Sequence, residues 1–338
     1  RNQVVDALVW QLDSANVHRT DRRVRVADAL GQLRQKVAIP YLVHAATQKV
    51  RVGWDGQLTY DLTSVRMAAA AALQRYLMPT FAREIKEASP NLAELLCLWG
   101  DRTVKELREH LVTGDVTKRA VAAAALADIQ TEEAVQALID AVFKVDTPTD
   151  TRWALMDALA QLDPVRVTRE VIVPLIEEGA APWYERLAYL IGKTRTQDST
   201  ALAFLDRCLH ELKRVDTKAK AIQSVGWLQD RTKVRLLQLV AMGHFEEIDQ
   251  ACQQEITPDD PPDVQAVKRG FPLGKVSMQN RQYLRRKAIE ALAELGEADT
   301  LAPLRDGRVD WDTELRRAFY WASEEIYWRE QVRRQQSL

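Results

Sequence analysis

Apolar and small residues recur along most of the chain at the three- and four-residue spacing of amphipathic helices. In several segments a basic residue is followed seven positions later by an apolar one, with small residues between them, which predicts a series of similar helices. These segments are 23–30 (RVRVADAL), 66–73 (RMAAAAAL), 119–126 (RAVAAAAL), 152–159 (RWALMDAL), 218–225 (KAKAIQSV), 285–292 (RRKAIEAL) and the segment that begins at Arg316. The segment 183–190 (WYERLAYL) fits the series with Trp183 in place of the basic residue.

The segments recur at a nearly constant period. The steps from 119 to 152, 152 to 183, 183 to 218 and 285 to 316 are 33, 31, 35 and 31 residues. Each segment also follows a second amphipathic stretch, and one helix pair per period predicts an α-solenoid. These partner stretches include 38–46, 133–143, 169–178, 199–212, 233–242 and 300–304. The step from 218 to 285 is 67 residues, which predicts one degenerate repeat near residue 251.

An aspartate stands just before several of these helices, and a carboxylate there can accept hydrogen bonds from the free N–H groups of the first turn. The residues are Asp115, Asp150, Asp216 and Asp312. An aspartate at the turn, a basic residue and an Ala-rich helix together resemble the HEAT-repeat family, in particular the short bacterial HEAT-like repeats found in phycobilin lyases. The resemblance covers 110–325 well and 1–80 less well. It implies an all-α, HEAT-like α-α superhelical solenoid of about eight or nine helix pairs, forming a single array over 1–338.

Four segments depart from the repeat. Alternating apolar residues around Asp55-Gly56 predict one inserted β-hairpin over 48–63. We expect extra helices over 78–100, and a long loop over 256–282, where the acidic, Pro-rich start is typical of an exposed connection. Aromatic residues at helical spacing predict that 311–338 caps the array, with an oligomer or partner surface as the alternative.

Insertions are common contact surfaces of solenoids. In the hairpin, Trp54 and Tyr60 either pack on the helices or form a finger offered to a partner. In the long loop, Lys268, Arg269, Phe271 and Lys275 either contact a partner or belong to an inert linker. All six are candidate contact residues.

Most of the repeated segments open with a basic residue, called the anchor below. These anchors have two interpretations. Within the family resemblance, the basic residue and the aspartate form a ladder that holds successive turns in register. Alternatively, residues such as Arg119, Arg152 and Arg285 form a positive stripe that contacts phosphates or an acidic partner. HEAT-like alkylpurine DNA glycosylases use Trp and Asp on a basic face. Trp153 and Trp183 lie near the starts of successive repeated segments, with Arg152 and Arg186 beside them. Trp153, Trp183 and Arg186 are therefore further candidate contacts.

Composition narrows the possible chemistry. Lys and Arg number 47 against 48 Asp and Glu, a balance that disfavours a dedicated nucleic-acid-binding protein. The five histidines are dispersed and the three cysteines are widely separated, so we expect no catalytic residues, no metal site and no cofactor. Separate thiols are typical of a reducing compartment, which predicts a cytoplasmic location. No apolar run is long enough for a membrane helix.

These patterns favour a non-catalytic protein–protein interaction scaffold or sensor module. Arg1 opens the chain within a helical pattern, so we expect a segment of a larger bacterial signalling or antiviral defence protein. Its partner would be another protein or a fused upstream domain. The alternatives are a nucleic-acid-binding protein resembling the DNA glycosylases, or an enzyme resembling the phycobilin lyases.

Overall fold

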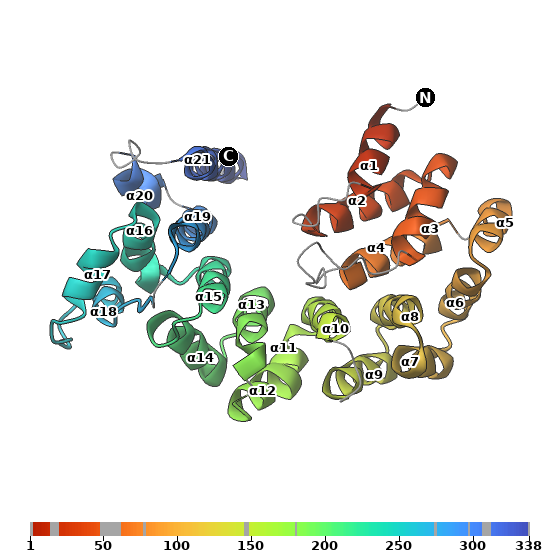
Figure 1. The fold of residues 1–338 in the computed structure, drawn as a ribbon, viewed down its shortest axis with the longest axis horizontal. Coiled ribbons are helices and arrows are strands. Elements are labelled where there is room, and N and C mark those ends of the chain that lie inside the picture. Colours follow the sequence, from red (N-terminus) through yellow and green to blue (C-terminus); the bar gives the residue numbers. More distant parts are fainter. Residues whose placement is uncertain are drawn as a thin grey trace. The chain divides into compact units, whose positions relative to one another are not determined.

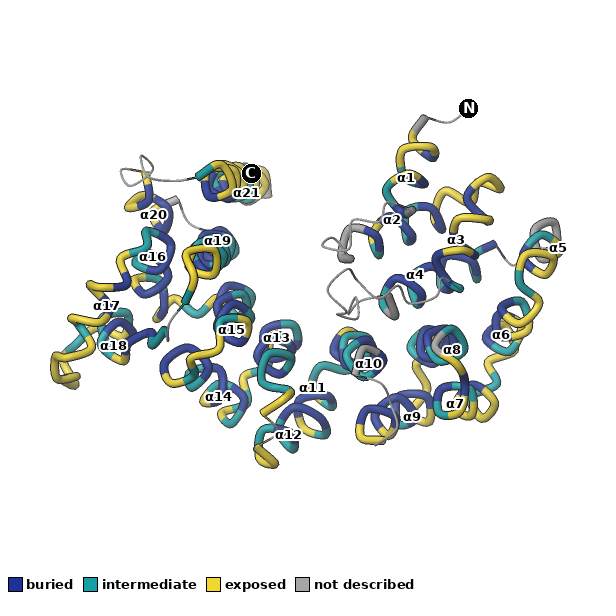
Figure 2. Tube along the Cα trace, viewed as in Figure 1, coloured by how far each residue is buried: buried dark blue, intermediate teal, exposed yellow. Residues whose placement is uncertain are grey.

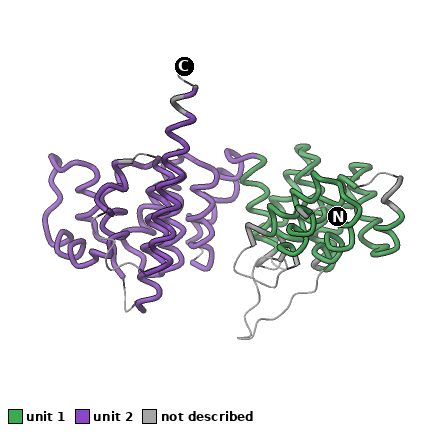
Figure 3. The backbone as a smooth tube through the Cα atoms, turned by 90° about the horizontal axis from the view of Figure 1, so that it is seen from above, with its two compact units in different colours: residues 1–162 green, residues 163–338 purple. Residues whose placement is uncertain are grey.

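The described part of the protein is built from helices. The computed structural model describes residues 3–13, 20–47, 62–76, 79–144, 149–179, 181–273, 276–296, 298–305 and 312–336. Within these ranges there is no β-strand, which confirms the expected all-α helical-repeat class. The chain divides into two compact units, residues 1–162 and 163–338 (Figure 3). Residues 48–61 of the predicted hairpin, with Trp54 and Tyr60, lie outside the described residues, as does Lys275, whereas the last two hairpin positions, 62 and 63, are helical.

In the described part of unit 1 there are four helix pairs of the repeat (Figure 1). The pairs are α1 (Gln3–Asp13) with α2 (Thr20–Leu33), α3 (Ile39–Thr47) with α4 (Leu62–Gln74), α7 (Val104–Thr113) with α8 (Val116–Ile129), and α9 (Glu132–Phe143) with α10 (Thr149–Leu162). The second helices pack directly on one another, α2 on α4, α4 on α8 and α8 on α10. Over 78–100 the structure has two further helices, α5 (Pro79–Ala88) and α6 (Pro90–Gly100).

Unit 2 also contains four pairs. The first helices are the interrupted helix α11 (Pro164–Val167) and α12 (Val173–Glu177), joined by a π-helical turn, followed by α14 (Ser199–His210), α16 (Val234–Met242) and α20 (Ala298–Leu301). The second helices are α13 (Tyr184–Thr194), α15 (Val215–Leu228), α19 (Met278–Leu295) and α21 (Thr313–Gln336). They form a continuous row in which α15 packs on both α13 and α19, and α19 packs on α21.

The expected degenerate repeat near residue 251 is wrong. Because α19 packs on α16 as its partner and on α15 as its neighbour in the row, the 67-residue step is a single repeat with an insertion between its two helices. The inserted segment, 244–277, carries α17 (Phe245–Ala251) and α18 (Pro262–Lys268). The expected long loop over 256–282 is wrong in two places: α18 interrupts it, and its last five residues belong to the helix Met278–Leu295. Pro262 is tolerated in the first turn of α18, where its missing N–H costs no hydrogen bond.

Two of the four predicted capping aspartates act as expected. Asp115 accepts a hydrogen bond from the amide of Lys118 (2.9 Å), and Asp312 accepts one from the amide of Leu315 (2.8 Å). Asp216 was assigned wrongly, because α15 begins one residue earlier and Arg214 occupies the capping position. Asp150 lies inside the first turn of α10.

Small residues let successive second helices approach closely. A Cβ atom added to Gly192 would lie 2.5 Å from the Cα of Ser224, and one added to Gly226 would lie 2.9 Å from the Cα of Ala291. Gly31 meets Ala72 of α4 in the same way, at 2.8 Å. In each case the residue eight positions after the anchor of one second helix faces the residue six positions after the anchor of the next second helix. In α13 this register holds for Tyr184 as the anchor, one residue later than the predicted Trp183.

Candidate functional site

Five of the seven basic anchor residues cap the preceding helix of their own pair. Arg23 Nε donates to the carbonyl of Leu12 (2.9 Å), Arg119 to that of Val112 (3.4 Å) and Arg285 to that of Ala241 (3.0 Å). Arg152 and Lys218 follow the same rule with the carbonyls of Lys144 and Leu209. Each of these carbonyls lies at the C-terminal end of a helix, where backbone acceptors lack an intrahelical partner and the helix dipole favours a cation.

This capping changes the interpretation of the repeat signal. The family ladder was expected to join aspartates and basic residues between repeats, whereas these five contacts join a side chain to a backbone carbonyl. Arg285 reaches Ala241 across 44 residues of sequence, because the inserted segment leaves the geometry of the pair unchanged. The regular recurrence of these cations along the chain therefore reflects a requirement of helix pairing.

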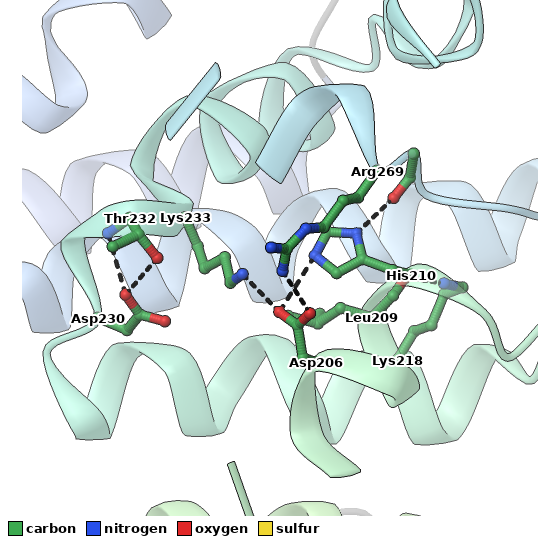
Figure 4. Close-up of polar contacts among 9 residues, drawn as sticks. Asp206, Leu209, His210, Lys218, Asp230, Thr232, Lys233 and Arg269 are labelled. Carbon is green, nitrogen blue, oxygen red and sulfur yellow. Dashed lines mark hydrogen bonds and ion pairs between the residues drawn. The ribbon is translucent and has the colours of Figure 1, made fainter. Parts of the chain in front are cut away.

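The inserted segment is held to α14 and α16 by a cluster of charged groups centred on Asp206 (Figure 4). Asp206 Oδ1 accepts a hydrogen bond from Lys233 Nζ (2.5 Å), and Oδ2 accepts one from Arg269 Nη1 (2.7 Å). His210 Nε2 lies 3.5 Å from Asp206 Oδ1, while its Nδ1 lies 2.7 Å from the carbonyl oxygen of Gly270. Since that carbonyl can only accept, Nδ1 carries the proton.

The electrostatics of this cluster stabilise an ionised carboxylate. Burial acts to raise the pKa of Asp206, but its contact with the imidazole of His210 and the hydrogen bond and positive charge of Lys233 hold the pKa of this carboxyl well below its usual range. Within the insertion, Lys268 Nζ pairs with Asp260 Oδ2 at 2.8 Å. Two cations of the insertion, Lys268 and Arg269, are thus paired with carboxylates of the chain.

Lys218 and Cys208 lie beneath the insertion. Lys218 is 0% exposed, and its ammonium group lies 4.2 Å from the centre of the ring of Phe271, which is itself buried. Burial lowers the pKa of Lys218 to about 7 and raises the pKa of the Cys208 thiol to about 12. A lysine with such a pKa suits nucleophilic or general-base chemistry, but the absence of exposed surface separates Lys218 from any substrate.

A pocket of about 600 Å³ opens beside Asp206, between α14 and the turn that leads into α16. Its polar lining is internally paired, since Asp206 binds Lys233 and Asp230 accepts hydrogen bonds from Thr232. Among the described residues, no group of three or more His, Cys, Asp and Glu side chains could hold a metal ion. The pocket therefore lacks a convergent set of polar groups directed at a ligand.

A different surface combines cations with aromatic rings. Arg186 Cζ, Lys220 Nζ and Lys193 Nζ lie 4.8, 5.2 and 5.7 Å from the ring centre of Tyr189, within the range of cation–π attraction. The ring of Trp227 meets Tyr189 edge to face at 5.3 Å. These five residues, named the Tyr189 face below, come from the neighbouring second helices α13 and α15 and are all partly exposed.

An acidic group borders the Tyr189 face. Glu185 follows Tyr184 at the start of α13, and burial raises the pKa of its carboxyl against the opposing attraction of Lys220. The face is therefore a mixed polar and aromatic surface with an excess of positive charge at Tyr189.

The structure distributes the predicted contact residues among different roles. Arg119, Arg152 and Arg285 cap helices, and Lys268, Arg269 and Phe271 hold the insertion in place. Arg186 belongs to the Tyr189 face, Trp183 lies just before α13, and Trp153 lies in α10 of unit 1. Sequence reasoning missed Tyr189, Lys193, Lys220 and Trp227, although their spacing on consecutive repeats was visible.

The comparisons with known proteins agree with the helix pairing. Residues 22–48 and 118–143 match the PBS lyase HEAT-like repeat family, which confirms the expected resemblance to HEAT-like repeats. These segments cover α2 with α3 and α8 with α9, so each contains the second helix of one pair and the first of the next. The chain is thus a helical-repeat scaffold, a class that generally mediates protein interactions.

The other comparisons add little. No curated protein matches the chain. A crystal structure of an engineered protein from a structural genomics consortium is 14% identical, and the alignment covers 96% of this chain and 98% of that one, with a TM-score of 0.28. A TM-score this low carries no argument about fold or function. None of the described helices is long and apolar enough to cross a membrane.

The Asp206 cluster leads to a first prediction. Asp206→Asn is expected to loosen the inserted segment and to lower the unfolding free energy by about 1–2 kcal/mol, because Lys233 and Arg269 lose a carboxylate that is one-third exposed. Hydrogen exchange at the amides of Gly270 and Phe271 measures the loosening. Asp259→Asn removes an exposed carboxylate from the same segment and is the matched control. Equal exchange rates in the two variants would contradict the prediction.

Proposed function

We propose that this chain is a non-catalytic interaction scaffold whose unit 2 binds an acidic segment of a partner protein at the Tyr189 face. The observation that carries the proposal is the set of three cations around one partly exposed tyrosine, beside a partly exposed tryptophan. Tyr, Trp and Arg are the residues that contribute most often to binding energy in protein interfaces. A partner carboxylate would meet positive charge there while its apolar neighbours pack on the rings.

What supports a protein partner over nucleic acid is the use of the basic anchors. Arg119, Arg152 and Arg285 donate to helix carbonyls, so these cations are engaged at positions that the stripe interpretation assigned to phosphates. The nearly equal numbers of basic and acidic residues also favour a protein partner over nucleic acid.

The wider setting of the proposal comes from the resemblance to bacterial HEAT-like arrays. In that setting the two units belong to a single array over 1–338 and act in the cytoplasm as a sensor or docking segment of a larger signalling or defence protein. The hairpin over 48–63 remains a predicted second contact surface on unit 1.

The test compares charge reversals on two sides of unit 2. Lys220→Glu alters the Tyr189 face, whereas Arg235→Glu makes the same charge change at an exposed position of α16 in the row of first helices. Immobilised wild-type protein and both variants are incubated with nuclease-treated cell lysate, and retained proteins are identified by mass spectrometry. We expect the wild type and Arg235→Glu to retain the same defined protein. Lys220→Glu should bind this protein about tenfold more weakly, or worse.

Two outcomes would contradict the proposal. Retention of the same proteins by all three forms would place binding elsewhere on the chain. Retention of nucleic acid from untreated lysate, lost steeply as salt is raised, would instead favour the nucleic-acid alternative.

A further inference from the structure

The last described helix, α21, carries two apolar stripes on opposite sides. Leu315, Phe319, Ala322 and Ile326 are buried, and α21 packs on α19. On the opposite side four aromatic side chains remain exposed, which exceeds what closing the end of a helical array requires. They are Tyr320 (58% exposed), Trp321 (45%), Tyr327 (55%) and Trp328 (64%). The tube of α21 accordingly carries exposed stretches (Figure 2). The C-terminal end of α21 also runs beyond the other helices of unit 2 (Figure 3).

The exposed stripe is symmetric about Glu324. Tyr320 and Trp328 lie four residues to either side of it, and Trp321 and Tyr327 lie three residues to either side. At roughly 100° per residue, all four side chains project within about 60° of the direction of Glu324. The stripe therefore has aromatic rings at the same four positions when the helix is read in either direction, with Tyr and Trp exchanged.

Because its aromatic positions are spaced symmetrically, the stripe can pair with the same stripe of a second copy about a two-fold axis, as in an isologous dimer. We propose that a second copy of this chain packs antiparallel against α21, with the two-fold axis passing beside Glu324. In this arrangement Tyr320 meets the partner's Tyr327 on one side of the helix pair, and Trp321 meets the partner's Trp328 on the other. Every exposed aromatic side chain of the stripe then gains an aromatic neighbour from the other copy.

The exposed area is sufficient for a modest dimer. A buried aromatic side chain removes roughly 150–250 Å² from water, so four that are about half exposed offer roughly 400 Å² per copy. The pair of copies would bury roughly 800 Å² through these rings, and Val332, which is 49% exposed, extends the stripe. This total lies below the roughly 1,200 Å² of stable interfaces and in the range of weak, transient ones, so we expect a dissociation constant on the order of tens of micromolar.

The position of Glu324 makes the geometry specific. On the two-fold axis, the two copies of Glu324 face one another, and like charges at that distance oppose association. Glu324→Gln removes this repulsion. We therefore expect the variant to dimerise about tenfold more tightly at low salt, where the repulsion is least screened. An arrangement with another axis would leave this variant without effect.

Disulfide crosslinking tests the axis directly. In a background with Cys97→Ser and Cys252→Ser, which replaces the two exposed cysteines, Glu324→Cys is expected to form a covalent dimer under mild oxidation. Gln335→Cys, exposed on the same helix, is the control. Its two copies would lie roughly 30 Å apart in the proposed dimer, at a rise of 1.5 Å per residue. Equal crosslinking of both variants would overturn the proposed axis.

Sedimentation velocity across a range of protein concentrations tests the surface. We expect the wild type to dimerise and Trp328→Ala to remain monomeric with unchanged helical content, since Trp328 is 64% exposed. Trp10→Ala removes a 73% exposed tryptophan from unit 1 and should dimerise as the wild type does. A wild type that stays monomeric at about 100 μM, or a Trp328→Ala variant that still dimerises, would refute the proposal.

Discussion

Gly192→Ala is expected to lower the unfolding free energy by about 2–3 kcal/mol, the opposite of the usual effect of replacing a helical glycine. At an exposed helical position alanine gains roughly 0.5–1 kcal/mol over glycine. In α13, however, the new Cβ would lie 2.3 Å from Ser224 Oγ and 2.5 Å from the Cα of Ser224. The backbone of α15 must therefore move, and the hydrogen bond from Ser224 Oγ to the carbonyl of Ala188 (2.6 Å) is disturbed.

The control for this prediction is Gly100→Ala, at the last residue of α6. A Cβ there meets only Gln74 Nε2 at 3.6 Å, an ordinary contact, so this variant is expected to be neutral or slightly stabilising. Urea unfolding followed by circular dichroism measures both. A Gly192→Ala variant as stable as the wild type would show that α13 and α15 do not need the close approach.

Lys218 is expected to make the stability of the protein depend on pH between 7 and 9. Its pKa in the folded protein is about 7, against an ordinary value of 10.5, so within this range the unfolded chain binds a proton that the folded protein does not. Stability therefore rises with pH, by at most about 1.4 kcal/mol per unit. Over the two units the contribution of Lys218 amounts to about 2 kcal/mol.

Cys208 ends this rise. Its pKa is about 12 in the folded protein against an ordinary 9.0, so above pH 9 the unfolded chain loses a proton that the folded protein retains. Stability then falls with pH through this group. The two contributions nearly cancel between pH 9 and 10, which predicts a plateau there.

The measurement is the difference in unfolding free energy between the wild type and Lys218→Met at pH 7, 8 and 9. Methionine keeps much of the apolar volume but cannot ionise, so the stability of the wild type relative to this variant should increase with pH. Lys213→Met removes an exposed lysine three residues beyond α14 and serves as the control for the loss of one lysine. A constant difference between the wild type and Lys218→Met would show that Lys218 titrates alike in the folded and unfolded chain.

Periodicity was enough to locate the helices because each one buries one face, and burial on a helix imposes the three- and four-residue spacing. The segments that begin at Arg119, Arg152, Lys218 and Arg285 each lie within the second helix of a pair. Boundaries were less predictable. Asp216 resembles Asp312 in sequence, but the backbone of α15 turns helical before it, and local composition does not decide that difference.

The insertion shows the limit of reading a period. A step of 67 residues is numerically two repeats, and only the packing of α19 on α15 and α16 shows that it is one. The roles of Lys268, Arg269 and Phe271 depended on the same packing. An exposed, charged segment in the sequence became a docked one because Asp206, His210 and Lys218 lie beneath it.

The sequence by itself determined the helical class, the repeat and the positions of the basic anchors, because each follows from residue spacing along one helix. The tertiary structure decided what the anchors bind, how the insertion is held and which residues form the Tyr189 face. These depend on distances between side chains far apart in the sequence, such as Tyr189 and Lys220, or Arg285 and Ala241. Hydrophobic spacing specifies which face of a helix is buried, whereas contacts between helices specify what the remaining side chains meet.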